Sequence, residues 1–373
     1  QRRVPGENNY GNMMVSRAMK DAFRAHPVAV NAEQLNFRSL RELPDSFKWA
    51  LGNDDVTRTA DSEEVPLIDL LEDNAVEKIG EACKSLGAFQ VTNHGLSPSL
   101  LSEMDKLCRR LFSLPVHHKL KAARLPGGVT GYGVARISSF FSKLMWSEGF
   151  TILGSPKDHF RQLWPRRYSK YCALVKEYDK EMEVLSGKLL RMMLRALGVS
   201  VEDTNWPKPI QHCAATQLNY YPSCPEPDQA MGLAAHTDST LFTVLYQSNT
   251  AGLQLFTERT GWITVPPISE GLVINVGDLM HILSNGVYKS VLHRARVNRT
   301  RDRVSIAYLL GPPADQRIAP LPQALAHGQP PLYRSVTWNE FLSAKAKYFN
   351  KALLSVRVGG EANEWLPADI SVQ

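Results

Sequence analysis

The fold is decided by two stretches of the chain, Ala234-Ala-His-Thr-Asp238 and Ser290-Val-Leu-His-Arg-Ala-Arg-Val297. On a β-strand, side chains two residues apart leave the same face, so His236 and Asp238 point the same way. His293 shares its face with the apolar residues of its own stretch and therefore points inward. Two imidazoles and one carboxylate on one side of a metal form the facial triad of non-haem Fe(II) oxygenases. The sequence therefore predicts a metal site made by His236, Asp238 and His293.

A second pair of polar residues follows ten residues after His293, in the strand-like run Arg303-Val-Ser-Ile-Ala-Tyr-Leu309. Arg303 and Ser305 alternate on one face. A guanidinium and a hydroxyl on the inner wall of a barrel suit a carboxylate held at two points away from water. Three protein ligands leave room on the metal for a bidentate co-substrate and for O2. The combination predicts a 2-oxoglutarate-dependent oxygenase.

The chain has ten histidines, so the choice of the second imidazole needs a reason. His281 competes with His293, but it lies in a segment that predicts a short capped helix and a turn, which is a poor source of a ligand facing a strand. His94 lies in a predicted turn and is expected to form structural hydrogen bonds. His117 and His118 follow a proline at a helix start and are expected to be solvated.

Strands dominate the chain after residue 212. Short apolar runs separated by turn residues predict eight of them: 214–221, 231–236, 241–247, 252–256, 261–265, 271–276, 290–297 and 303–310. Eight short strands in about a hundred residues favour a mainly β fold with a double-stranded β-helix, or jelly roll, flanked by helices. The mouth of such a barrel is a usual place for a metal and a small ligand.

The remaining segments predict five regions in chain order. They are a loosely ordered extension (1–62), an N-terminal α/β domain (63–167), a long scaffold helix (168–200), the catalytic barrel (211–313) and a C-terminal tail with a helix (314–373). The extension contains one amphipathic helix near 15–23. Residues 125–167 lack a clear period and predict loops over a site. No GxGxxG motif is present, which excludes a dinucleotide-binding fold.

Composition excludes several classes of protein. The net charge of +6 is partly local to the arginine-rich strands after residue 290, but no nucleic-acid-binding signature accompanies it. We expect a solvated outer strand face there, with Arg303 alone pointing inside. No apolar run is long enough for a membrane span. Five scattered cysteines without CxxC spacing predict reduced thiols in a cytoplasmic protein. We also expect a monomer.

Several motifs together resemble the plant 2-oxoglutarate- and Fe(II)-dependent dioxygenases over about residues 64 to 350. They are Asn219-Tyr-Tyr-Pro-Ser-Cys-Pro225, Ala235-His-Thr-Asp238, Gly277-Asp278, His293-Arg-Ala295 and Arg303-Val-Ser305. The resemblance implies that the His-Asp-His triad binds iron and that Arg303 and Ser305 clamp the distal carboxylate of 2-oxoglutarate. It further implies that Tyr221, together with Asn219, helps to hold this co-substrate, and that ascorbate serves as a reductant.

A narrower similarity, carried by segments 131–136, 137–150 and 275–286, is to gibberellin 3-beta-hydroxylases. It implies hydroxylation of C19 gibberellins at carbon 3 with O2, releasing succinate and CO2. A tetracyclic diterpenoid acid needs an apolar pocket and a group for its carboxylate. The candidates in 136–146 are Phe140, Phe141, Met145 and Trp146 for the rings, and Arg136, Ser138, Ser139 and Lys143 for the carboxylate. Arg136 is favoured over Lys143 because a guanidinium grips a carboxylate at two points; simple packing is the alternative for each aromatic ring.

Three other functions are compatible with the same residues. A sister oxygenase would act on another gibberellin carbon or on a flavonoid. A zinc hydrolase would use the same three ligands but would leave Arg303 and Ser305 without a role. A non-catalytic barrel would bind small molecules only.

Overall fold

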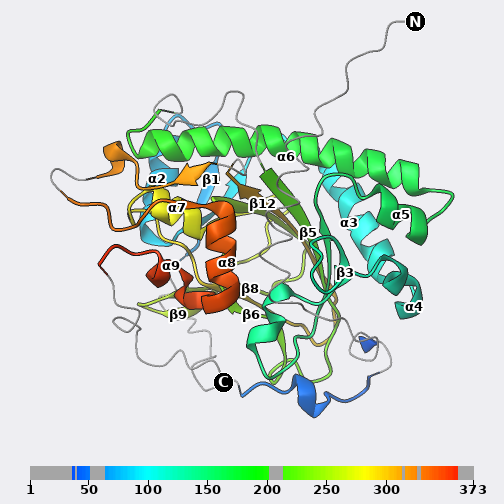
Figure 1. Ribbon diagram of the computed structural model, residues 1–373. Helices are drawn as coiled ribbons and strands as arrows, with labels where there is room; N and C mark the ends of the chain where they lie inside the picture. The colour runs from blue at the N-terminus through cyan, green and yellow to red at the C-terminus, as the bar shows by residue number, and fades with distance from the viewer. Residues whose placement is uncertain are drawn as a thin grey trace, which may run out of the picture.

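Two β-sheets face each other and form the core of the protein. The computed structural model describes residues 36–37, 40–50, 64–200, 213–312, 316–325 and 329–359. The major sheet has the strand order β1-β2-β10-β7-β12-β5-β4-β3, and the minor sheet has the order β6-β11-β8-β9 (Figure 1). The predicted double-stranded β-helix is therefore confirmed.

Each of the eight strands predicted after residue 212 is present. They are β5 (Cys213–Tyr221), β6 (Met231–His236), β7 (Phe242–Gln247), β8 (Leu253–Thr257), β9 (Gly261–Thr264), β10 (Leu272–Val276), β11 (His293–Arg296) and β12 (Arg303–Gly311). The largest difference is at β11, which is shorter than the predicted 290–297. Its pairing with β6 contains register shifts on both sides of Ala295, which end the regular ladder early.

Four strands from the N-terminal region extend the major sheet at both of its edges. β1 (Leu67–Asp69) and β2 (Ala88–Thr92) lie at one edge, and β3 (Gly131–Gly133) and β4 (Glu148–Ile152) lie at the other. The prediction of loops throughout 125–167 is therefore wrong at β3 and β4, and also at the helix α5 (Lys157–Leu163). All residues of both strands are buried, so neither shows the alternation of polar and apolar residues that marks a half-exposed strand.

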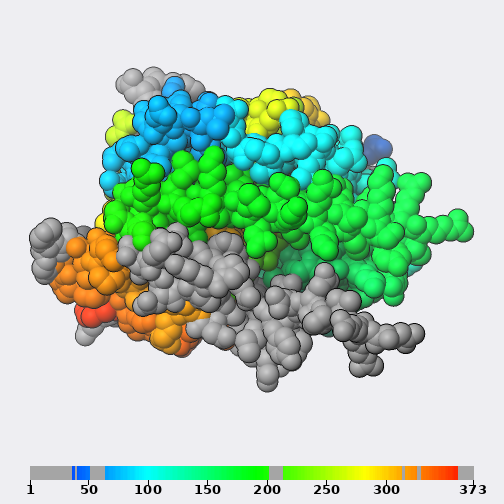
Figure 2. All heavy atoms as spheres, turned by 90° about the horizontal axis from the view of Figure 1, so that it is seen from above, coloured from blue at the N-terminus to red at the C-terminus, as the bar shows by residue number. Residues whose placement is uncertain are grey.

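Helices cover the outer face of the major sheet (Figures 1 and 2). They are α2 (Ala75–Ser85), α3 (Pro98–Phe112), α4 (Val116–Lys119), α5 (Lys157–Leu163) and the long α6 (Tyr168–Ala196). Buried residues of α6 recur at three- and four-residue spacing, as Tyr178, Met182, Leu185 and Leu189 do, because one face of the helix packs on the layer below. The scaffold helix is thus confirmed. Within the described part of the chain, no helix has the length and apolar content needed to cross a bilayer.

The C-terminal region lies over the barrel mouth. α8 (Trp338–Tyr348) begins at a capping box, in which Thr337 accepts from the Glu340 amide and Glu340 accepts from the Thr337 amide. The C-terminal helix is thus confirmed. The shorter elements are η3 (Asp45–Phe47), η5 (Leu120–Ala122), η6 (Arg136–Phe140), α7 (Asp278–Leu283), β13 (Arg317–Ile318), η8 (Pro322–Ala324), β14 (Val336–Thr337), η9 (Phe349–Lys351) and α9 (Ala352–Ser355).

Part of the N-terminal extension is packed against the core. The rings of Phe37 and Phe47 lie edge-on to Trp146, with centroids 4.8 and 5.2 Å away. The backbone amide of Trp49 donates to Gln229 O at 2.8 Å. The prediction of a loosely ordered extension is therefore wrong for 40–50, because its aromatic residues bury against the barrel. The helix predicted at 15–23 lies outside the described residues.

A buried ion pair joins α4 to β4. The Lys119 ammonium donates to Glu148 and to the Phe112 carbonyl, and the Tyr132 hydroxyl donates to the same carboxylate. All three side chains are almost completely buried. The three partners together satisfy charges that would otherwise be costly to remove from water.

We predict that Lys119→Met lowers the free energy of unfolding by about 3–5 kcal/mol, because it removes the ammonium that pairs with the buried Glu148 carboxylate. Urea denaturation measures the change. Lys121→Met, an exposed lysine of the neighbouring η5, is the matched control and should change stability by less than about 0.5 kcal/mol. Equal stability of the two variants would contradict the prediction.

Candidate active site

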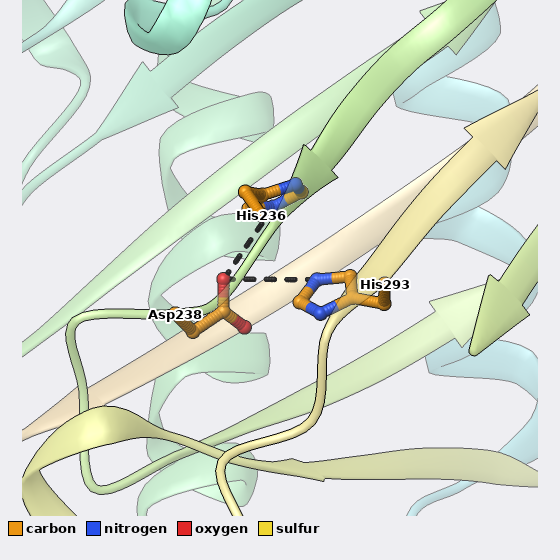
Figure 3. A group of neighbouring side chains, drawn as sticks. All are labelled: His236, Asp238 and His293. Carbon is orange, nitrogen blue, oxygen red and sulfur yellow. Dashed lines mark ion pairs between the residues drawn. The ribbon is translucent and has the colours of Figure 1, made fainter. Parts of the chain in front are cut away.

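The predicted triad is assembled at the ends of two neighbouring strands. His236 is the last residue of β6 and His293 is the first residue of β11, and the two are directly paired across the strands. Their ring centroids are 4.3 Å apart. Asp238 Oδ1 lies 3.7 Å from His236 Nε2 and 3.8 Å from His293 Nε2 (Figure 3). Among the described residues, this is the one cluster of histidine, cysteine and acidic side chains with metal-binding spacing.

Hydrogen bonds orient the three side chains so that their metal-binding atoms point toward one position. His236 Nδ1 lies 2.8 Å from Ala234 O and His293 Nδ1 lies 3.1 Å from Val291 O. Because a carbonyl only accepts, both Nδ1 atoms carry the proton, which leaves the Nε2 lone pairs free for a metal. The Thr243 hydroxyl donates to Asp238 Oδ2 at 2.6 Å, which leaves Oδ1 for the same metal.

The protonation states suit a divalent metal. Burial, with a contribution from His293, lowers the pKa of His236 to about 4, so this imidazole is neutral at pH 7. Burial alone would raise the pKa of Asp238, but the two imidazoles and the Thr243 hydrogen bond lower it overall. Two imidazoles and one carboxylate on one side of an open centre fit Fe(II).

A buried cation lies on β12 of the major sheet, opposite the minor sheet that carries the two histidines. Arg303 is 2% exposed, and none of the described carboxylates forms an ion pair with it. Its Nη2 donates to Gln247 Oε1 at 3.1 Å, and its guanidinium carbon lies 5.0 Å from the centre of the Tyr221 ring. Nε has no hydrogen-bond acceptor within the described part of the chain. A buried guanidinium with an unused donor fits an anionic ligand such as a carboxylate.

The other predicted co-substrate residues surround Arg303. Pairing of β12 with β5 places Arg303 opposite Tyr221 and Ser305 opposite Asn219. Asn219 Nδ2 donates to Ser305 Oγ at 3.4 Å. Burial raises the pKa of Tyr221, with Arg303 opposing the shift, so the phenol keeps its proton and can donate it.

A cavity of about 310 Å³ between the two sheets contains the triad and Arg303. Its walls are mostly apolar. They come from the barrel (Leu233, Leu245, Leu253, Ala295, Ala307 and Leu309), from the loop around η6 (Val129, Ala135, Ile137 and Phe140) and from the C-terminal region (Trp338, Leu342, Ala346 and Phe349). Arg124, Arg136 and Lys345 add positive charge.

Only some of the predicted substrate residues line this cavity. Arg136, Ser139 and Phe140 do. Trp146 does not: it is fully buried, its indole N–H donates to Pro222 O at 3.2 Å, and its ring packs on the N-terminal segment. The prediction that Trp146 contacts the substrate is therefore wrong, and the packing alternative holds. Ser138, Phe141, Lys143 and Met145 also lie outside the lining.

Sequence reasoning missed the contribution of the C-terminal region. The ring of Phe349 stacks on that of Phe140 with centroids 4.7 Å apart, which joins the η6 loop to the end of α8. The spacing of Trp338, Leu342 and Phe349 could have revealed an inward helix face. Arg124, which follows η5, gave no signal in the sequence.

The other histidines and the arginine-rich strands follow the predictions in part. His281 lies in α7 and contacts Tyr288 O and the Tyr333 hydroxyl, not the metal site, as expected. His94 also forms structural hydrogen bonds. His118 was expected to be solvated, but it is half-buried and its Nε2 lies 2.9 Å from Leu163 O.

Arg294 was expected on a solvated face, and that prediction is wrong. It is buried, it stacks over Trp262 at 4.0 Å, and its Nε donates to Gln254. The apolar stem and planar head of arginine allow such burial beside an aromatic ring. Arg299 and Arg301 are exposed, as expected.

Comparisons with known proteins agree with this geometry. Residues 212–312 match the model of the 2OG-Fe(II) oxygenase superfamily, and residues 65–167 match that of the non-haem dioxygenase in morphine synthesis N-terminal region. The chain is 55% identical to gibberellin 3-beta-dioxygenase 1 of Pisum sativum, over 91% of this chain and 94% of that protein. The chain belongs to the gibberellin 3-beta-dioxygenase family. It is also 54% identical to gibberellin 3-beta-dioxygenase 1 of Arabidopsis thaliana, over 91% of this chain and 98% of that protein.

Solved structures of other related proteins share the fold. The crystal structure of JOX2 in complex with 2OG, Fe, and JA is 33% identical, with a TM-score of 0.71 over 84% of this chain and 92% of that one. The structure of a dioxygenase for auxin oxidation in rice is 26% identical, with a TM-score of 0.65 over 79% of this chain and 100% of that one. The protein is thus a 2-oxoglutarate- and Fe(II)-dependent dioxygenase.

We predict that Asp238→Ala abolishes stoichiometric iron binding, because two imidazoles alone hold the metal weakly. Metal analysis of purified protein after equilibration with Fe(II) measures this directly. His281→Ala is the control and should retain one iron per chain while losing some stability. Full iron content in Asp238→Ala would show that the assignment is wrong.

We predict that Arg303→Lys weakens the apparent affinity for 2-oxoglutarate by about 1.5–3 kcal/mol, or about ten- to hundredfold. The lysine ammonium keeps the positive charge but cannot form the two parallel hydrogen bonds that a guanidinium gives a carboxylate. Titration of the metal-loaded protein with 2-oxoglutarate measures the change. Arg301→Lys alters an exposed arginine two residues away and should have no effect. Unchanged saturation in Arg303→Lys would place the clamp elsewhere.

Proposed function

We propose that the protein hydroxylates C19 gibberellins at the 3-beta position, using O2 and 2-oxoglutarate in gibberellin biosynthesis. The observation that carries the proposal is an apolar cavity, containing arginines on its loop wall, that opens directly on the iron triad. Such a cavity suits a rigid hydrocarbon skeleton that bears a carboxylate. Family members at 49–55% identity are gibberellin 3-beta-dioxygenases, which supports the same substrate.

Arg136 is the proposed anchor for the gibberellin carboxylate. Burial, with repulsion from Arg124, lowers the pKa of Arg136 to about 9, so its guanidinium stays charged at pH 7. Burial lowers the pKa of Arg124 to about 10, and Arg124 Nη2 donates to Val134 O at 2.6 Å. A carboxylate bound near both groups would relieve the repulsion between them.

The remaining side chains divide the work of the reaction. Bound Fe(II) and 2-oxoglutarate supply the activation of O2, with succinate and CO2 as co-products and ascorbate as the reductant of the metal. Arg303, Ser305, Tyr221 and Asn219 hold the distal carboxylate of the co-substrate. Phe140 and the other apolar side chains hold the rings and exclude water, so that the pose of the substrate decides which carbon reacts.

The main alternative is a related oxygenase that acts on another gibberellin carbon or on a flavonoid. A zinc hydrolase would leave the buried Arg303 without a purpose. The predicted monomeric state and cytoplasmic location belong to the proposal, and light scattering and localisation of a tagged full-length chain test them.

We predict that Arg136→Ala raises the KM for a C19 gibberellin at least tenfold and leaves 2-oxoglutarate binding intact, because a charged hydrogen bond contributes about 1.5–3 kcal/mol. Steady-state kinetics with each substrate varied in turn separates the two effects. Lys143→Ala is the control, because Lys143 lies outside the cavity and donates to Asp45 O. A gibberellin KM that is unchanged in Arg136→Ala would refute the anchor.

The product itself is the test of the whole proposal. With Fe(II) and 2-oxoglutarate, mass spectrometry of a gibberellin panel should show one added oxygen at carbon 3, and the methyl esters should react poorly. An enzyme that ignored C19 gibberellins but hydroxylated a flavanone would overturn the substrate and leave the iron chemistry standing.

A further inference from the structure

A buried ion pair links α8 to the start of α7, and its lysine also bonds the metal-binding loop, the segment 236–240 that carries His236 and Asp238. Lys345 of α8 donates to Asp278 Oδ2 at 2.9 Å and also to the Thr237 hydroxyl. Thr237 lies between His236 and Asp238 in the chain. The Asp278 side chain is 0% exposed and that of Lys345 is 12% exposed. Neither charge therefore has water as an adequate alternative partner.

Asp278 is connected to the metal-binding loop at several points. Its carboxylate accepts from Thr237 at 3.1 Å and from Ser290, which precedes β11, at 2.7 Å. Its backbone amide donates to the carbonyl oxygen of Asp238 at 2.8 Å. One carboxylate thus connects the residue after His236 to the segment before His293.

The backbone at Gly277, just before α7, packs so closely on Thr240 that no side chain fits between them. A Cβ on Gly277 would lie 2.3 Å from the carbonyl oxygen of Thr240, so only glycine allows the start of α7 to approach the loop this closely. The position of Asp278 relative to Asp238 is therefore set by backbone packing.

The same side of α8 also forms the wall of the cavity. Trp338, Leu342 and Lys345 recur at helical spacing, and all three line the cavity. The Trp338 indole donates to Ser239 O at 2.6 Å, so α8 is bonded to the metal-binding loop at two points, two turns apart. A shift of α8 would move the cavity wall and the loop together.

We propose that Lys345 and Asp278 are positioning residues, whose ion pair holds α8 and the metal-binding loop in one arrangement and so couples the shape of the substrate cavity to the metal centre. The inference rests on the metal site of the proposed function. Removal of the ion pair should therefore weaken both metal binding and substrate binding. Partners that orient metal ligands contribute about ten- to hundredfold to metal affinity.

The test compares three variants by Co(II) titration, followed by visible absorption without substrate. Lys345→Met should raise the Kd for Co(II) about tenfold and raise the gibberellin KM more than it lowers kcat. Lys347→Met removes an exposed lysine from the same helix and should match the unaltered protein in every measurement.

The double variant Lys345→Met with Asp278→Asn separates positioning from charge balance. It leaves no buried charge without a partner, so its melting temperature should recover toward that of the unaltered protein. If the pair positions the loop, the Kd for Co(II) and the gibberellin KM stay raised. A return of both to the unaltered values would overturn the proposal.

The double variant also decides the question if Lys345→Met does not fold. The Co(II) measurement needs no turnover. It therefore tests the positioning role even if the proposed substrate proves wrong.

Discussion

Antiparallel pairing of β6 with β11 sets His236 directly opposite His293, and the rest of the site depends on this register. A slip by one residue would turn one imidazole to the outer face of the sheet, because the side-chain period of a strand is two. The pairing of β12 with β5 does the same for Arg303 and Tyr221. Two strand registers therefore place the metal donors and the anion-binding group in one cavity before any loop contributes.

The cavity carries more buried positive than negative charge. Arg124, Arg136, Arg294, Arg303 and Lys345 line it, whereas Asp238 is the one carboxylate among the described lining residues. Charges interact strongly where water is excluded, so this imbalance favours acidic ligands. A dicarboxylate co-substrate and a monocarboxylic substrate would both reduce the cost of keeping these guanidinium groups buried.

Segments far apart in the chain complete the substrate side of the cavity. Trp49 contacts Phe141 and donates its indole N–H to Leu144 O at 2.8 Å, so the N-terminal segment supports the η6 loop from outside. Phe140 stacks on Phe349 at the other side of that loop. Phe349 has a φ of 50°, a backbone conformation that costs a non-glycine residue energy and persists only where packing holds it. The loop wall is thus held between the two ends of the described chain.

Local pattern alone predicted the barrel, the long helix, the metal triad and the Arg303–Ser305 pair, because strand alternation fixes which side chains share a face. His236 with Asp238 and Arg303 with Ser305 are visible at that level, as is the exclusion of His281 by its helical context. Tyr221 and Asn219 were predicted from the family resemblance. The buried strands β3 and β4 show no alternation of polar and apolar residues, so the sequence did not predict them. Tertiary structure decided that Trp146 packs on Phe37 and Phe47 while Arg124 and Phe349 face the cavity. Those outcomes depend on contacts between residues far apart in sequence, and no local period encodes such contacts.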